Sequence, residues 1–218
     1  MGICFEKYRL QPSPAFARLN LTPLKESRAV IIFVVGGPGA GKSTLCKRLA
    51  AKYGMTLILV SDILREEIRS GSEQGQYFKM FMDTGDIVPA NPIVQLVVEK
   101  MLANLNTTGY LVVGFPRDKK QAVLFNTEVR QPDLMLNLYA RRLILQDRMA
   151  MRSSSVARFD DTPEAICNRL IQYYANIKRA IAPNKRVTKT IDAELGKEEV
   201  FAQVSKLVEE TLTRSWRS

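Results

Sequence analysis

One short stretch of this chain combines glycines, a lysine and hydroxyl side chains in a pattern suited to phosphate binding. Residues 36–43 read Gly-Gly-Pro-Gly-Ala-Gly-Lys-Ser and match G-x-x-x-x-G-K-[ST]. Such a loop points backbone N–H groups at phosphate oxygens, while Lys42 can reach the outer phosphates and the Ser43 hydroxyl can ligate Mg²⁺. An apolar run at 29–35 precedes the loop and a helical pattern follows it. The sequence therefore predicts a nucleotide-binding loop between a strand and a helix.

The residue types that are missing or scattered narrow the chemistry further. The 218-residue chain has no histidine, which excludes Ser-His and Cys-His nucleophiles and histidine metal sites. Phosphoryl transfer to a nucleoside monophosphate survives this test, because the acceptor oxygen is already anionic and needs no general base. Three widely spaced cysteines form neither a disulfide framework nor a zinc site. We expect Cys46 and Cys167 to be small core residues in a reducing compartment.

The overall charge favours anionic partners without choosing among them. The chain carries 32 basic and 22 acidic residues, a formal net charge of +10. A nucleic-acid-binding protein is a weak alternative, because no basic patch with interleaved aromatics is evident. No apolar run approaches 18 residues, so we expect no transmembrane segment and a cytoplasmic location. Gly2 and Cys4 resemble a dual acylation signal, but Glu6 stands where that signal has Ser or Thr, so membrane tethering is weakly supported.

Apolar runs alternate with helical patterns along most of the chain. Strands are expected at 29–35, 55–60, 110–113, 134–139 and 186–192, and helices at 43–53, 62–70, 74–84, 92–105, 119–129, 141–151, 162–182 and 197–212. This order predicts an α/β fold, a parallel sheet with helices on both faces, which binds nucleotides at the carboxyl ends of its strands. Residues 1–28 contain three prolines and are interpreted as an N-terminal extension of a domain that spans 29–218.

Five blocks of sequence together resemble adenylate kinase, and more broadly the nucleoside monophosphate kinases of the P-loop NTPase type with a short lid. The blocks are residues 36–44, 62–65, 85–89, 114–117 with Gln121, and 158–161 followed by Arg169 and the tyrosine pair at 173–174. The resemblance runs from about residue 29 to 212. It implies a helical monophosphate-binding part at about 61–90 and a short lid at about 152–160. It also implies transfer of a phosphoryl group from MgATP to AMP, giving two ADP.

The resemblance implies roles residue by residue. Catalytic roles fall on Lys42, Arg117, Arg148, Arg158 and Arg169. ATP binding falls on Gly37, Pro38, Gly39, Ala40, Gly41, Lys42, Ser43, Thr44, Arg148 and Arg152. AMP binding falls on Asp62, Arg65, Val88, Gly114, Arg117, Gln121, Arg158 and Arg169. The arginines suit this chemistry, because their planar forks meet the oxygens over which a transferring phosphoryl group spreads its charge. Asp160 and Asp161 are interpreted as caps ahead of the helix at 162.

The chain also departs from the family pattern at its metal and acceptor positions. Val113 stands where the family has an aspartate that orients water on Mg²⁺, and Ser43 stands where the family has glycine. We hypothesise that direct ligation by Ser43 partly replaces the missing carboxylate. Leu59-Val60-Ser61 replaces the family's Ser-Thr-Gly, which removes a threonine hydroxyl from the acceptor site.

Two alternative functions stay open beside an active adenylate kinase. One is a catalytically weakened relative that docks in a larger assembly, with residues 1–28 as the docking segment. The other is a UMP/CMP kinase, although Asp118 and Gln121 favour adenine over a pyrimidine acceptor. We expect the chain to be a monomer.

Overall fold

The computed structural model describes residues 19–153 and 159–217. The predicted acylation residues Gly2 and Cys4 and the predicted lid residue Arg158 lie outside these ranges, as does most of the proposed docking segment. The strands are β1 (Val30–Gly36), β2 (Thr56–Leu59), β3 (Gly109–Val113), β4 (Leu134–Tyr139) and β5 (Thr188–Asp192). The helices are α2 (Thr22–Glu26), α3 (Lys42–Tyr53), α4 (Val60–Arg69), α5 (Glu73–Thr84), α6 (Ala90–Leu102), α7 (Lys119–Glu128), α8 (Arg142–Ser153), α9 (Pro163–Ile181), the 3₁₀ helix η1 (Ala182–Val187) and α10 (Lys197–Arg217).

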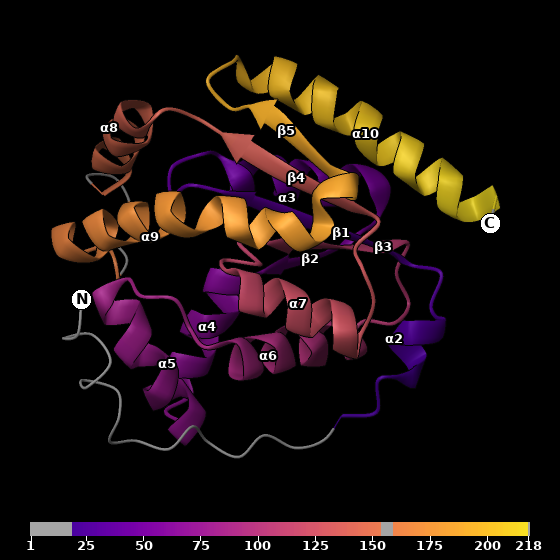
Figure 1. Ribbon diagram of the computed structural model, residues 1–218, viewed down its shortest axis with the longest axis horizontal. Coiled ribbons are helices and arrows are strands. Elements are labelled where there is room, and N and C mark those ends of the chain that lie inside the picture. Colours follow the sequence, from indigo (N-terminus) through magenta and orange to yellow (C-terminus); the bar gives the residue numbers. More distant parts are fainter. Residues whose placement is uncertain (1–18, 154–158, 218) are drawn as a thin grey trace.

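The five strands form one parallel sheet in the order β2-β3-β1-β4-β5. Helices cover both of its faces (Figure 1), as the alternation of strands and helices predicts. Alternate residues of the central strand β1 point to opposite faces, so Ile31 and Phe33 belong to one core cluster while Ile32 and Val34 belong to the other. Because β1 is buried on both faces, its sequence is a continuous apolar run.

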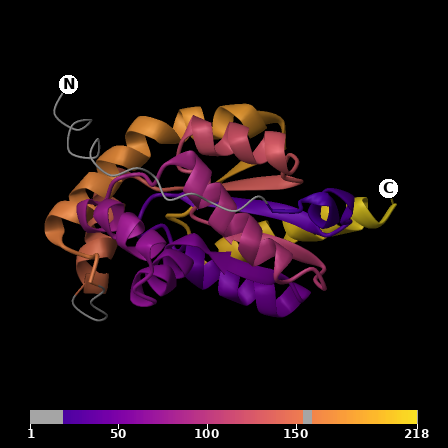
Figure 2. The ribbon, with the colours of Figure 1, turned by 90° about the horizontal axis from the view of Figure 1, so that it is seen from below.

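The two core clusters differ in the helices that build them. One cluster contains buried side chains of α4, α5, α6 and α7, with an edge-to-face contact between Phe33 and Phe125 at 5.0 Å between ring centroids. Figure 2 shows α7 and α9, in pink and orange, lying next to each other. The other cluster packs Leu45 and Leu49 of α3 against Val204 and Val208 of α10. The sheet is thereby held between two apolar layers, which fixes the ends of its strands.

Side chains at the helix starts fix several boundaries. Asp118 accepts a hydrogen bond from the Gln121 N–H at 2.8 Å and begins α7. Thr162 accepts one from the Ala165 N–H at 3.1 Å and begins α9, with Pro163 in its first turn. The predicted caps Asp160 and Asp161 do not take this role, because Thr162 fills it.

Two other local expectations, the start of the last strand and the burial of Cys167, differ from the structure. The last strand begins at Thr188 rather than 186, because η1 continues the turn of α9 through Val187. Within the extension, Leu24 of α2 is buried in the core. Cys46 is buried as predicted, but the prediction that Cys167 belongs to the core is wrong. Cys167 lies two residues after the buried Ala165 on α9 and therefore on the opposite side of the helix.

No helix of the described residues combines the length and the apolar character that crossing a lipid bilayer requires.

Candidate active site

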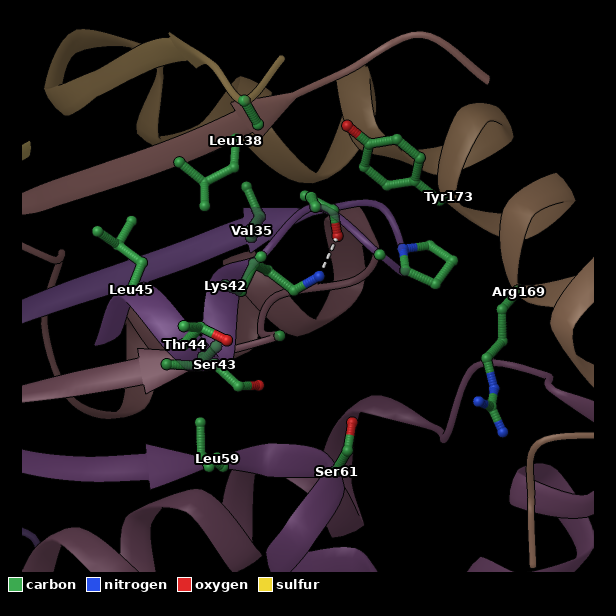
Figure 3. Close-up of a pocket in the computed structure, with 18 of the residues that line it drawn as sticks. Val35, Lys42, Ser43, Thr44, Leu45, Leu59, Ser61, Leu138, Arg169 and Tyr173 are labelled. Carbon is green, nitrogen blue, oxygen red and sulfur yellow. Dashed lines mark hydrogen bonds between the residues drawn. The ribbon is translucent and has the colours of Figure 1, made fainter. Parts of the chain in front are cut away.

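A cavity of about 700 Å³ opens at the carboxyl ends of the strands. It is lined by residues at or just after the ends of all five strands: Gly36, Ser61, Gly114, Leu138 and Ala193. Residues of helices α3, α4, α8 and α9 are among those that line the rest of it, and Figure 3 shows Ser43 of α3, Ser61 of α4 and Tyr173 of α9 around the same space. In open parallel sheets this edge is where ligands bind. The cavity therefore stands where the strand–helix alternation predicts a nucleotide site.

The glycine-rich loop forms one wall of this cavity. Residues from Pro38 to Thr44 all line it, and α3 begins at Lys42 after Gly41 adopts a left-handed conformation with φ of 83°. The Lys42 ammonium group donates hydrogen bonds to the carbonyl oxygens of Gly36 at 2.7 Å and Gly37 at 2.8 Å. Figure 3 shows one of these bonds as a dashed line from Lys42. The lysine thus folds back over its own loop, and its positive charge is held at the phosphate-binding wall.

The absence of a side chain at Gly37 has a packing reason. A Cβ atom there would lie 2.4 Å from Leu145 Cδ1 of α8 and 3.2 Å from the ring of Tyr173 of α9. The loop can therefore sit against both helices only if this residue is glycine. Burial raises the pKa of Tyr173 to about 12, helped by Tyr174 and Tyr139, so the phenol stays neutral beside the loop.

Arg148 and two hydroxyl side chains complete the wall next to the loop. Arg148 donates a hydrogen bond to the Ala193 carbonyl oxygen at 2.8 Å, which ties α8 to the end of β5. Ser43 and Thr44 are exposed and line the cavity, and Figure 3 shows both side chains next to Lys42. The side chain of Arg152, a predicted ATP-binding residue, lies outside the described part of the structure. These residues place a cation and two hydroxyl groups beside the phosphate loop.

A buried ion-pair cluster forms the opposite wall. Asp160, whose side chain is 0% exposed, accepts hydrogen bonds from Arg65 at 2.8 and 3.2 Å and from Arg169 at 2.7 Å. Arg65 also pairs with Asp62 at 2.5 Å, and Arg169 pairs with Asp161 at 2.9 Å. Burial disfavours the charged form of Asp160, but the two arginines outweigh it and hold the pKa of this carboxyl below its usual value.

Arg117 lies in the same cluster but is held by neutral oxygens. Its guanidinium group donates to the Gly114 carbonyl oxygen at 3.2 Å and to the Ser61 hydroxyl at 3.0 Å. Burial, together with the like charges of Arg169 and Arg65, lowers the pKa of Arg117 to about 10. The side chain is still cationic at neutral pH. An anion placed in this cavity would relieve the repulsion among the three arginines.

The two residues predicted to meet the acceptor base do not line the cavity. Gln121 and Val88 are both buried, and the Gln121 amide donates to the Val88 carbonyl oxygen at 2.9 Å. The other end of the Gln121 amide accepts from the Arg117 N–H at 2.8 Å. Gln121 thus ties the turn before α6 to the turn before α7, and its contact with a base stays a prediction.

Few residues of this cavity could bind Mg²⁺. Val113 is 4% exposed at the end of β3 and has no ligating atom. Within the described ranges, no three His, Cys, Asp or Glu side chains cluster closely enough to hold a metal ion. The exposed hydroxyl of Ser43 in the cavity wall is a hard oxygen of the kind Mg²⁺ accepts. The described residues therefore fit a magnesium ion that binds together with nucleotide phosphates. They do not provide the full set of protein ligands that would hold the ion alone.

The structure brings most of the predicted site residues into one cavity. Its walls include Pro38, Gly39, Ala40, Gly41, Lys42, Ser43, Thr44, Asp62, Arg65, Gly114, Arg117, Arg148 and Arg169. Sequence reasoning missed Asp160 and Ser61, which line the same cavity and contact its arginines. A carboxylate directly beside predicted phosphate-binding arginines was the signal available for Asp160. For Ser61 the only signal was its departure from the family glycine.

Comparison with known proteins points to one family. The family model described as adenylate kinase matches residues 34–188. Adenylate kinase isoenzyme 1 of Cyprinus carpio is 37% identical over 185 residues, which are 84% of this chain and 95% of that protein. The human isoenzyme 1 is 36% identical over 183 residues, 83% of this chain and 94% of that protein. Human adenylate kinase isoenzyme 5 is 36% identical over 182 residues, which are 82% of this chain and 32% of that longer protein.

Proposed function

Because this chain belongs to the adenylate kinase family of phosphotransferases, we propose that it moves the terminal phosphoryl group of MgATP to AMP and releases two ADP. The observation that carries the proposal is the pairing of a glycine-rich phosphate loop with a three-arginine wall across a single cavity. A donor triphosphate on the loop and an acceptor phosphate on the arginines would point at each other in this arrangement.

The chemistry asks for positioning and charge, and these residues supply both. An oxygen of the acceptor phosphate forms a bond to the terminal phosphorus of ATP, and the bond from that phosphorus to the bridging oxygen breaks, so the leaving group is ADP. Lys42 and the N-terminus of α3 hold the donor phosphates. Arg117 and Arg169 meet the equatorial oxygens, on which negative charge spreads during transfer. Arg65 and Arg117 bind the acceptor phosphate.

We propose that the magnesium ion binds together with ATP. When bound, it would supply positive charge that neutralises the donor phosphates. We propose that the Ser43 hydroxyl holds it in place of the carboxylate that Val113 lacks. Support comes from the exposure of Ser43 to the cavity and from the hydroxyl chemistry of other phosphate loops.

AMP is the proposed acceptor, and a pyrimidine monophosphate is the alternative. Asp118 and Gln121 favour adenine by family resemblance, although Asp118 also caps α7. The relationship to adenylate kinases does not favour the docking alternative. Residues 19–28 pack on the core through Leu24, so any docking role would fall to the residues before them.

An acceptor panel tests the proposal. The full chain is incubated with MgATP and one of AMP, CMP, UMP or GMP, and nucleotide products are separated and quantified. We expect diphosphate formation to be fastest with AMP. Faster turnover of CMP or UMP would replace AMP by a pyrimidine acceptor, and no product from any of the four would overturn phosphoryl transfer to monophosphates.

A further inference from the structure

The three arginines of the acceptor wall are held in two different ways. Arg65 and Arg169 donate to carboxylates, and both reach Asp160. Arg117 donates instead to a backbone carbonyl and to the Ser61 hydroxyl, and among the described residues no carboxylate lies within ion-pair distance of it. A cation held by neutral oxygens keeps its full net charge for a ligand. The Ser61 hydroxyl is therefore part of the support of the one arginine of this three-arginine wall that makes no ion pair with a described carboxylate.

Ser61 is placed to touch a ligand as well. It is the second residue of α4 and lines the cavity, and Figure 3 shows its hydroxyl pointing into that space from the side opposite the phosphate loop. The helix does not need this hydroxyl as a cap, since its N-cap position is Leu59, which makes no side-chain cap bond. The leading N–H groups of α4 add partial positive charge to the same wall.

The hydrogen bond from Arg117 uses the Ser61 hydroxyl only as an acceptor. A serine hydroxyl can accept and donate at the same time, and here it accepts from a cation. Its own O–H then remains to donate, and an anionic oxygen beside Arg117 is the acceptor that this environment favours. The family pattern has glycine at this position, which can offer no such group.

We propose that Ser61 is a ligand of the acceptor phosphate in this chain. Its hydroxyl accepts a hydrogen bond from Arg117, which fixes the guanidinium group, and donates one to a phosphate oxygen of the bound monophosphate. The loss of the threonine hydroxyl at Val60 is thereby offset by a hydroxyl one residue later, directed at phosphate. This inference rests on the proposed function, because it assumes a monophosphate in the acceptor half of the cavity.

Equilibrium binding separates this inference from turnover. Calorimetric titration of AMP into the full chain, without ATP, gives a dissociation constant that needs no catalysis. We expect Ser61→Ala to weaken AMP binding about tenfold, the size of one hydrogen bond between charged and neutral groups. Ser61→Thr keeps the hydroxyl and is expected to bind AMP within about twofold of the unaltered chain. Adenosine, which lacks the phosphate, is expected to bind both variants equally.

Two further variants define the role of the hydroxyl. Ser70→Ala makes the same exchange at the far end of α4, outside the cavity, and is expected to leave AMP binding unchanged. In an Arg117→Ala background, Ser61→Ala is expected to cost less than in the unaltered chain, because the two groups act on one phosphate.

The outcomes separate the two proposals. Equal AMP affinity of the unaltered chain and Ser61→Ala would overturn the inference while leaving phosphoryl transfer intact. An equal loss for AMP and adenosine would also overturn it, since the phosphate would then not be the group contacted. Weaker AMP binding by Ser61→Ala in a chain that forms no ADP would support the inference and refute the proposed function.

Discussion

The carboxylate of Asp160 accepts two hydrogen bonds from the guanidinium group of Arg65, at 2.8 and 3.2 Å, in a position closed to solvent. Arg169 approaches the same carboxylate from α9 at 2.7 Å. One buried anion therefore links the helix after β2 to α9 across the acceptor wall. It also lets two cations lie close together inside the protein, which neither could do without a counter-charge.

Loss of this carboxylate charge should destabilise the fold. Asp160→Asn leaves Arg65 and Arg169 buried without a shared anion, and removing one partner of a buried ion pair costs about 3–5 kcal/mol. Urea unfolding followed by circular dichroism measures this change. Asp83→Asn is the control, because Asp83 and its partner Lys79 are 43% and 51% exposed and such pairs contribute about 0–1 kcal/mol. A similar small change in both variants would contradict a structural role for Asp160.

Acidification should remove the same contribution. The folded state holds the pKa of Asp160 below its ordinary value, so the stabilisation is fully present above the ordinary carboxyl pKa of about 3.9. It is lost as pH falls through the lower folded-state pKa. We therefore expect the stability difference between the unaltered chain and Asp160→Asn to be constant near neutral pH and to shrink below about pH 4. A difference that grows on acidification would show that Asp160 is buried protonated.

We expect Gly85 to tolerate no side chain, because of its backbone conformation and because of its contact with α9. It ends α5 with φ of 74°, and a Cβ atom there would lie 2.4 Å from the Ala165 carbonyl oxygen of α9. Gly54 ends α3 with a similar φ of 63° but has open space around it. Gly54→Ala is therefore expected to cost about 1 kcal/mol from backbone strain, and Gly85→Ala several times more. Equal losses in thermal unfolding would mean that α5 and α9 separate easily.

Magnesium dependence should report on Ser43. If its hydroxyl ligates the ion, Ser43→Ala and Ser43→Gly should raise the Mg²⁺ concentration needed for half-maximal ADP formation about tenfold, while Ser43→Thr retains the ligand. Initial rates over a magnesium series at fixed ATP and AMP provide the measurement. Unchanged rates and an unchanged magnesium requirement in Ser43→Gly would end this hypothesis.

The parts of this molecule that could be predicted from sequence are those whose causes are local. The phosphate loop is a contiguous pattern, and the flanking strand and helix follow from an apolar run and a helical pattern beside it. The parallel sheet with helices on both faces follows from the alternation of strands and helices, whereas the order β2-β3-β1-β4-β5 was not predicted. The boundary near Thr188 was harder, because η1 continues the turn after α9 with residues that do not mark its end.

The contacts that complete the site were out of reach because they join distant residues. Arg65 and Asp160 are 95 positions apart, and Ser61 and Arg117 are 56 apart. The burial of Cys167 was predicted wrongly for a related reason. A residue in a helical pattern can face either side, and only the packing of α9 decides which. The family resemblance predicted the arginines of the site, but it did not predict that Ser61 would accept a hydrogen bond from Arg117.

ADP formation from MgATP and AMP by the full chain is the most direct test of the central claim. We expect two ADP for each pair of ATP and AMP consumed, and a rate at least about 100-fold lower in Lys42→Ala, which loses the ammonium group from the phosphate loop. A folded chain that forms no ADP, or a Lys42→Ala variant as active as the unaltered chain, would contradict it.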